Sequence, residues 1–504
     1  MVRCCTARRA RLRGVVRLVF VVLLSSQRVV SQEPGAPVLR EHRAAASFAY
    51  ELVRFPTGEA MGLIESRFLV SRFDDWAIGP AVVGAISGNR GGLFVLGAEL
   101  GWQHQFTERL ATVAGIFAGG GGGGSAPVGS GFMWRPFGGI RWKTGDIATD
   151  ILASHVEIGH GLLSSTQLAV GLSVPTTFRL VLHEQLDLPV PVRGRSGMGF
   201  DALEIIATIY RPIGVTGRRS GGALPTTLGL VGVRAERGVG EHAGFALEGA
   251  GAAAGGVSGY AEYLVHGWWR TWVADDRASL GVRFGAGMAG GGDIDTGGGL
   301  LLKGALIAAL RLGENASLNA EGGYVAAPEG GFRAVTASAS LAWRLDGAGA
   351  SATPQHAVRT EWWMGAEQYE AARVAGGTRA VSNVALRVNR FVTSTLYLTG
   401  QARSAFLGGA GGFSAGLLGA GVSVPFADGW RAGGEALLGA AGGGGISAGG
   451  GAVAQGHGFL ERALVDGTSV RVGTGYVRSL RGALAAPLVD LSLGYAFGVT
   501  RGGR

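Results

Sequence analysis

A glycine-spaced segment that occurs three times constrains this chain more than any other feature. Its copies start at Gly122, Gly290 and Gly442, so successive starts lie 168 and 152 residues apart. Each copy opens with three consecutive glycines, followed after four residues by further glycines. The last two copies read MAGGGDIDTGGG and AAGGGGISAGGG and align without a gap. Repetition of this kind predicts a module that the chain contains three times.

The composition is unusual for a water-soluble surface. Glycine supplies 93 of the 504 residues, whereas about 7 % is usual, and only 16 % of the residues are charged. The mean hydropathy is +0.27. A collagen fold is excluded because there is no Gly-X-Y period and the chain has only 15 prolines. A packed or lipid-facing β protein fits these values.

The formal net charge of +9 does not by itself indicate nucleic acid. The arginines are scattered singly along the expected strands and form no basic stripe interleaved with aromatic residues. The same excess of positive charge would attract the protein to anionic lipid equally well. We therefore expect no nucleic-acid partner.

The first 31 residues have the pattern of a removable export signal. Five arginines between Arg8 and Arg17 precede an apolar run from Leu18 to Leu24, and Val29-Val30-Ser31 fits a cleavage site. Both cysteines, Cys4 and Cys5, lie within it. The exported chain would therefore have no disulfide, no thiolate metal site and no cysteine nucleophile. Later apolar stretches fall short of the roughly 20 residues that a membrane-spanning helix needs, so any crossing must use strands.

Strict period-two alternation is the main signal of secondary structure. The final segment places Val489, Leu491, Leu493, Tyr495, Phe497 and Val499 on one face. Asp490 and Ser492 share the other face with glycine and alanine. Similar alternation occurs in Phe94–Trp102 and around Val384–Asn389. One apolar and one small or polar face suit a barrel with lipid outside, because only helices and closed sheets satisfy every backbone polar group in hydrocarbon.

The pattern predicts an all-β fold, an antiparallel transmembrane β-barrel built from three repeats of about eight strands. The expected repeats cover residues 45–178, 201–346 and 357–499. About 24 strands can close in two ways. They can form one large barrel, or each repeat can close alone to give three small barrels in tandem. Both alternatives stay open at the level of sequence.

The last strand resembles the assembly signal that ends Gram-negative outer-membrane β-barrels. The residues that carry this resemblance are Ser492, Gly494, Phe497 and Val499. The likeness is to the class as a whole, and no characterised family is assigned. It implies residence in the bacterial outer membrane, with membrane lipid and the barrel-assembly machinery as partners. The oligomeric state is open.

No group of residues reaches a catalytic or metal-binding constellation. His155, Glu157 and Ser164 supply the residue types of a lipid hydrolase, but His155 occupies an ordinary amphipathic position in the aligned repeats. Asp293 and Asp295 faintly resemble a calcium loop, yet the other copies carry no acid there. We expect no enzyme activity, no metal and no cofactor.

The sequence therefore predicts a pore or export channel for small or anionic solutes or polysaccharide. Arg387, Arg403 and Arg471 fall on the inward face, so they are candidate pore-lining residues that would favour anions. Two alternatives remain: a surface structural, adhesion or assembly scaffold, and a lipid hydrolase embedded in the barrel. The glycine segments have two interpretations as well, close backbone approach or flexible loop tips.

Overall fold

The computed structural model describes residues 39–500 except 74, 160–162, 187–188, 194, 215–216, 274–276, 346–349 and 466. The predicted export signal at residues 1–31 lies outside this part. Within the described part, every named element is a β-strand apart from the single 3-10 turn η1 (His183–Gln185). No helix found there is long and apolar enough to cross a membrane. The predicted all-β antiparallel class is confirmed.

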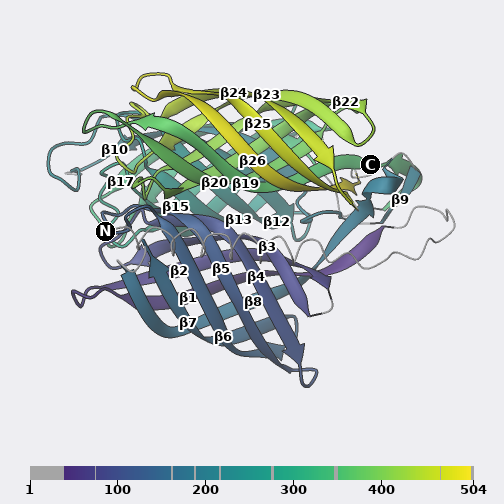
Figure 1. The fold of residues 1–504 in the computed structure, drawn as a ribbon. Helices are drawn as coiled ribbons and strands as arrows, with labels where there is room; N and C mark the ends of the chain where they lie inside the picture. The colour runs from purple at the N-terminus through teal and green to yellow at the C-terminus, as the bar shows by residue number, and fades with distance from the viewer. Residues whose placement is uncertain are drawn as a thin grey trace, which may run out of the picture. The chain divides into compact units, whose positions relative to one another are not determined.

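The first eight strands close on themselves as the first barrel. Strand β1 pairs antiparallel with β2 and also with β8, where Ala44 lies opposite Thr176. Figure 1 labels these strands and shows their tilt. They are β1 (Arg40–Arg54), β2 (Ala60–Phe73), β3 (Trp76–Ser87), β4 (Phe94–Gln105), β5 (Leu110–Gly122), β6 (Phe132–Thr144), β7 (Ile147–Ile158) and β8 (Leu163–Leu182).

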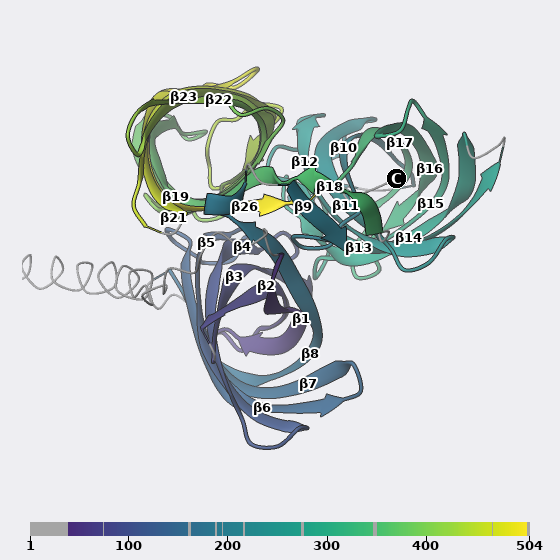
Figure 2. The same ribbon diagram turned by 90° about the vertical axis from the view of Figure 1, so that its right-hand side faces the viewer.

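The second barrel closes in the same way, because β10 pairs with both β11 and β17. Figure 2 looks into this barrel from one end. Its strands are β10 (Ala202–Pro212), β11 (Leu228–Gly238), β12 (Ala243–Ala254), β13 (Ala261–Val273), β14 (Ala278–Gly290), β15 (Leu300–Arg311), β16 (Ala316–Ala326) and β17 (Arg333–Arg344).

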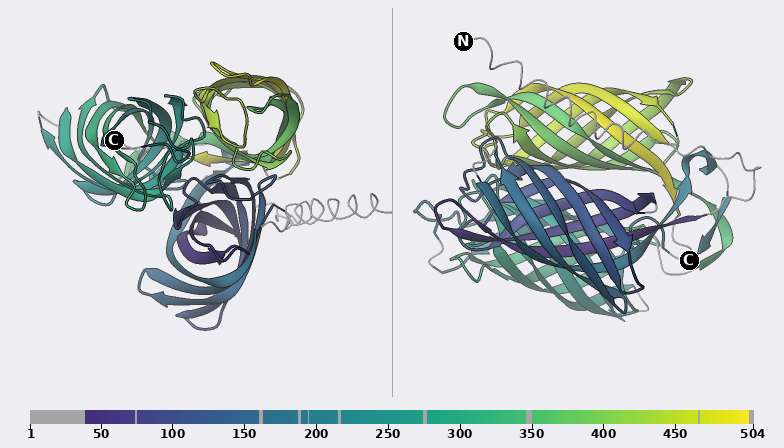
Figure 3. Two further views of the ribbon diagram at one scale, coloured as in Figure 1. Left: turned by 90° about the vertical axis from the view of Figure 1, so that its left-hand side faces the viewer. Right: turned by 60° about the horizontal axis from the view of Figure 1, so that its bottom comes forward.

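The third barrel is closed by β19 and β26, which pair from Val358 with Val499 to Tyr369 with Leu488. Figure 3 gives two further views of the strands. They are β19 (Val358–Ala372), β20 (Thr378–Phe391), β21 (Leu396–Leu407), β22 (Ser414–Ala427), β23 (Trp430–Gly442), β24 (Ala452–Ala463), β25 (Thr468–Ser479) and β26 (Ala485–Val499).

The connections between barrels contain little regular structure. Two short strands, β9 (Pro189–Arg193) and β18 (Ala350–His356), pair with each other. Strand β8 of the first barrel meets β26 of the third through only two residue pairs, Leu182 with Phe497 and Val181 with Gly498. Each eighth strand otherwise returns to the first strand of its own set. Of the two architectures that the sequence left open, the structure has separate eight-stranded barrels. The interior of such a barrel is narrow enough to be filled by side chains.

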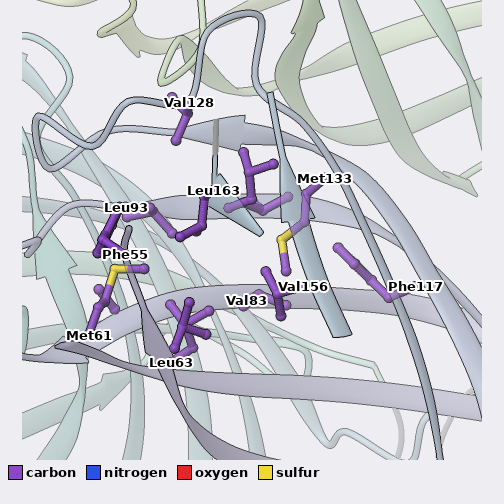
Figure 4. Close-up of a cluster of buried hydrophobic side chains, with 14 of the residues drawn as sticks. Phe55, Met61, Leu63, Val83, Leu93, Phe117, Val128, Met133, Val156 and Leu163 are labelled. Atoms are coloured by element: carbon purple, nitrogen blue, oxygen red, sulfur yellow. The ribbon is translucent and has the colours of Figure 1, made fainter. Parts of the chain in front are cut away.

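Each barrel has two ends that differ in chemistry. At the glycine end, which carries the predicted glycine segments, apolar side chains gather inside the barrel. In the first barrel these include Phe117, Leu63 and Met133, all fully buried (Figure 4). Corresponding clusters surround Tyr260 in the second barrel and Phe413 in the third. The other end, where β8, β17 and β26 finish, is called the opposite end below.

Outward side chains alternate with these inward ones and are mostly apolar. Leu168 on β8, which lies opposite Ala153 in the middle of β7, is 72 % exposed, whereas the inward Ala169 beside it is fully buried. The same pattern recurs at Leu306 and Leu438. Exposed tryptophan, and exposed phenylalanine apart from Phe284, lie toward the opposite ends, on Trp76, Phe106, Trp142, Trp269, Trp343, Phe426 and Trp430. Exposed tyrosines lie toward the glycine ends, on Tyr50, Tyr324 and Tyr476.

The glycine segments hold the barrels against one another. Gly92, Gly259 and Gly412 all take left-handed backbone angles, with φ of +92°, +89° and +92°. A Cβ on any of them would lie closer than 3.0 Å to backbone of another barrel: Gly92 against Gly291, Gly259 against Gly443, and Gly412 against Gly123. Only glycine satisfies both conditions, so close backbone approach, and not a flexible loop tip, explains these segments.

These contacts follow one rule around the molecule. The third strand of each barrel meets the fifth strand of another: β3 meets β14, β12 meets β23, and β21 meets β5. Backbone hydrogen bonds accompany them, from Gly91 N–H to Gly297 O at 2.9 Å and from Gly412 N–H to Gly121 O at 3.0 Å. The first barrel thus contacts the second, the second the third, and the third the first. Contacts of this head-to-tail type close when the rotation permits it, as in cyclic trimers.

We expect Gly92→Ala to weaken the association between barrels without unfolding them. The added methyl group would collide with Gly291 backbone, and the left-handed φ costs a non-glycine residue about 1–2 kcal/mol. The measurement is whether detergent-solubilised protein stays together after cleavage at a protease site inserted between the first and second barrels.

Gly376→Ala is the matched control, because Gly376 has φ +93° at the same end but no atom within 4 Å of its Cβ position. Equal behaviour of the two variants after cleavage would contradict the role given to the glycine contacts.

Candidate functional site: the charged interior of each barrel

Below the apolar cluster, the inward positions of each barrel carry charged side chains. These charged residues alternate with outward apolar residues on the same strands, so the period-two pattern alone directs them inward. Arg135, Arg234 and Arg471 are each fully buried, one in each barrel. Such a charge is tolerated in a closed interior only when carboxylates and hydrogen bonds compensate its lost hydration.

In the first barrel, two arginines share the carboxylates of four strands. Arg135 Nε lies 2.7 Å from Glu51 Oε1, and its Nη1 lies 3.2 Å from Glu65 Oε2. Arg67 Nη1 lies 2.8 Å from Glu99 Oε1. Arg67 Nη2 also lies 3.5 Å from Asp150 Oδ2. These carboxylates come from β1, β2, β4 and β7, so the ion pairs cross the lumen and tie distant strands together.

The second barrel has the densest network. Arg234 contacts three carboxylates: Glu204 at 3.0 Å, Glu248 at 2.7 Å and Glu321 at 2.6 Å. Lys303 Nζ lies 2.8 Å from Glu248. Nearer the glycine end, the hydroxyl groups of Tyr210 and Tyr260 both donate to Glu262, at 2.8 Å and 3.0 Å. The tyrosines thus connect the ion pairs to the apolar cluster above them.

The third barrel contains the three predicted pore-lining arginines. Arg387, Arg403 and Arg471 point inward, as the alternation predicts, but they are 2 %, 3 % and 0 % exposed. Arg387 pairs with Asp490 at 3.2 Å, and Arg403 with Glu367 at 2.8 Å.

Arg471 has a carboxylate on three sides. Glu435 lies at 2.9 Å, Glu461 at 3.2 Å and Glu361 at 3.6 Å, and its guanidinium stacks over the Phe459 ring at 3.8 Å. Each of the three arginines therefore has a carboxylate partner within the lumen, and their pore-lining role stays a prediction.

The three residues of the hydrolase alternative lie on the outer face of β7 and β8, and His155 hydrogen-bonds Thr166 instead of Ser164. His155 lies on the outer face of β7, where its Nδ1 hydrogen-bonds Thr166 Oγ1 at 2.8 Å and its ring faces Trp134. Glu157 and Ser164 are paired across β7 and β8. The inward Ser154 instead donates to Glu51 inside the lumen. His160, three residues after Glu157, lies outside the described residues. This arrangement provides no base positioned on a serine hydroxyl.

The two aspartates of the second glycine segment stabilise the loop. Asp295 accepts backbone N–H groups from Gly297 at 3.2 Å and Gly331 at 2.9 Å, and Asp293 accepts from the backbone and side chain of Ser220. Among the described residues, no group of three metal-ligating side chains is found. The carboxylates serve turns that the other barrels build without acids.

The four residues that resemble the assembly signal of outer-membrane β-barrels lie on β26. Ser492 is buried and donates to Asp490 at 2.9 Å, and the backbone of Gly494 lies against the Trp363 ring inside the lumen. Phe497 packs on Phe178 and Trp362, with ring centroids 5.5 Å and 5.6 Å apart. Val499 is buried beside it. The lower end of β26 therefore faces the first barrel, while Leu491 higher up remains exposed. Their part in assembly stays a prediction.

The acidic half of these networks was missed by sequence reasoning. Arg234 and Glu321 are 87 residues apart, and Arg471 and Glu361 lie on strands that sequence alone does not align in register. One signal was available: glutamates such as Glu99 and Glu361 stand at inward positions of period-two strands, where an unpaired carboxylate is too costly to bury.

Comparison with known proteins assigns the chain to no family. No protein-family model matches the sequence, and no curated protein matches it. Among solved structures, the copper transporter OprC is 10 % identical, with 92 % of this chain and 81 % of that chain covered and a TM-score of 0.30. Pseudomonas aeruginosa OccK2 (OpdF) is 9 % identical, with 92 % and 99 % covered and a TM-score of 0.22. The NanC porin is 7 % identical, with 58 % and 98 % covered and a TM-score of 0.17.

The likeness is one of class. These structures are outer-membrane β-barrels, the class that the final strand resembles. At such identities and TM-scores they say nothing about pore, solute or site in this chain.

Replacing Arg471 by methionine should destabilise the third barrel by about 3–5 kcal/mol, because three buried carboxylates lose their shared cation. Urea unfolding in detergent micelles, followed by the heat-dependent shift in gel mobility, measures this. Adding Glu435→Gln to Arg471→Met should restore part of the loss.

Arg478→Met is the control, since Arg478 lies on the same strand with an exposed side chain. Its effect should stay within about 0.5 kcal/mol. A loss below about 1 kcal/mol for Arg471→Met would mean that water, not the ion pairs, solvates this interior.

Proposed function

We propose that the chain is an integral outer-membrane protein whose three sealed barrels form a structural scaffold. The observation that carries this proposal is the content of the lumens. Each holds a layer of buried ion pairs beneath a buried apolar cluster, so side chains occupy the path that a solute would take. Scaffolds need a rigid wall, and cross-lumen ion pairs supply one.

The outer surface supports the membrane part of this proposal. Leu168, Leu306 and Leu438 are 72 %, 70 % and 63 % exposed. Exposure of these apolar side chains is unfavourable in water but not in hydrocarbon. The exposed tryptophan and tyrosine near the two ends match the aromatic girdles that sit at membrane interfaces. The net charge of +9 suits anionic lipid beside them.

Solute passage is the second candidate function. A cavity at the opposite end of the third barrel favours it, because it enters the lumen as far as Glu461 and Arg359. A passage would require the apolar cluster around Phe413 and Tyr369 to move. The ion-paired arginines give no basis for selecting anions, so the scaffold remains the first proposal.

We also propose that the three barrels are copies of one eight-stranded module. The recurring glycine segments support this, as do the equivalent contacts of third and fifth strands. The predicted repeat limits of 45–178, 201–346 and 357–499 are part of this proposal.

Conductance separates the two candidate functions. Purified, heat-modifiable protein inserted into planar bilayers should show no stepwise ohmic current, because ion pairs block each lumen. Stable steps would overturn the sealed scaffold and support solute passage. In that event Phe413→Ala should raise the unitary current, whereas Phe284→Ala on the exposed outer face should leave it unchanged if the third barrel conducts.

Leu168→Arg tests the membrane assignment. An arginine on the lipid face near the bilayer midplane should cost about 2–4 kcal/mol of folding free energy, measured by urea unfolding in lipid vesicles. Val239→Arg, in the turn after β11 and 76 % exposed, should cost about 0–1 kcal/mol. If Leu168→Arg keeps wild-type stability and renders the protein soluble without detergent, the exposed belt faces water.

A further inference from the structure

The third barrel has a cavity of about 330 Å³ at its opposite end. Strands β19 and β22 to β26 surround it, and η1 lies at its edge. Its titratable lining residues are His183, Glu184, Arg359, Arg431 and Glu461. The volume lies at the lower end of the range for small-molecule sites.

Arg431 is the cation of this cavity with spare hydrogen-bonding capacity. Its Nε donates to Ser423 Oγ at 2.8 Å and its Nη2 to the Ser423 carbonyl at 2.7 Å. No described carboxylate lies within 4.0 Å of it. By contrast, Arg359 pairs with Glu361 at 2.7 Å, and Glu461 pairs with Arg471 at 3.2 Å. The remaining N–H groups of the Arg431 guanidinium are free to donate hydrogen bonds to an anion.

His183 reaches this cavity from another barrel. It follows β8 of the first barrel, and its Cβ lies 3.2 Å from where a Cβ on Gly467 would stand. Its Nδ1 is buried and has no hydrogen-bond partner among the described residues. Burial, and then the nearby Arg359 guanidinium, lower the pKa of His183, so the ring is neutral at pH 7 and can offer an N–H.

These features are particular to the third barrel. Strands β5, β14 and β23 are the fifth strands of their barrels and begin with Leu110-Ala111, Ala278-Ser279 and Trp430-Arg431 respectively. At these two positions, neither of the other two barrels has the cation or the indole. Trp430 is 39 % exposed, and the Arg462 guanidinium stacks 5.3 Å from its ring. The indole places the cavity mouth at the level where tryptophans meet lipid headgroups.

We propose that this cavity binds a phosphate group, held by the Arg431 guanidinium and the His183 ring, with Trp430 at the entrance. Arginine binds phosphate through two parallel N–H donors, which the free edge of Arg431 can supply. Among the described residues that line the cavity, the exposed Glu184 at the rim is the one carboxylate without an ion pair. Its negative charge directs an anionic ligand away from the rim and inward. Both a lipid headgroup and free phosphate carry this chemistry. The inference goes beyond the scaffold, since it holds whether or not the lumens conduct.

Isothermal titration of the full chain in neutral maltoside micelles tests the proposal with two probes, inorganic phosphate and dihexanoyl phosphatidylglycerol. At least one should bind, and Arg431→Gln should weaken it about tenfold, or about 1.4 kcal/mol. His183→Ala, outside the barrel wall, should weaken binding severalfold and serves if Arg431→Gln misfolds. Binding of inorganic phosphate supports a free-phosphate site, whereas binding of the lipid alone supports a headgroup site.

Arg109→Gln is the matched control, because Arg109 is an exposed arginine at the opposite end of the first barrel. Its affinity should equal that of the unchanged protein. The proposal is overturned if neither probe binds, if Arg431→Gln and His183→Ala bind as tightly as wild type, or if Arg109→Gln loses as much affinity as they do.

Discussion

Buried ion pairing inside narrow barrels is the interaction on which the rest of this structure depends. Eight strands enclose little more than their own inward side chains, and in this chain many of those are charged. Arg135, Arg234 and Arg471 can remain there only because carboxylates from several strands surround them. Removing one partner would leave an uncompensated charge in a closed space, so the strand register and the charge pattern must agree.

The same constraint separates the inside from the outside of each wall. Polar groups that would be expensive in hydrocarbon face each other across the lumen, and the alternate positions are left for apolar side chains such as Leu168 and Leu438. An ion-paired interior and an apolar exterior are thus two results of one alternation. This is why the lumens favour a scaffold over an open pore, although Arg387, Arg403 and Arg471 point inward.

The glycine contacts solve a second problem, the joining of closed barrels. A closed sheet has no free edge, so barrels cannot associate by adding strands to one another. Backbone can still approach backbone where no Cβ intervenes, and Gly92, Gly259 and Gly412 provide such places. The brief pairing of β8 with β26 adds a contact between the first and third barrels. The glycine segments, for which flexible loop tips were the alternative interpretation, therefore form the contacts between barrels.

Much of the fold could be read from local pattern. The alternation at Val489–Val499 predicted an outer and an inner face, and β26 has them, except that Phe497 and Val499 turn out to be covered by the first barrel. The inward direction of Arg471 was also predictable. Its neutral surroundings were not, because Glu361, Glu435 and Glu461 come from three other strands. The cavity at Arg431 was missed for a similar reason, since His183 arrives from a different barrel.

By itself, the sequence determined the all-β class, the two faces of each strand and the places where only glycine recurs, because these depend on neighbours a few residues apart. Tertiary structure decided that strands close in eights, that each arginine meets its carboxylates, and that glycine backbones touch between barrels. Those outcomes depend on the register between distant strands, and a pattern of period two is the same in a large barrel and in a small one.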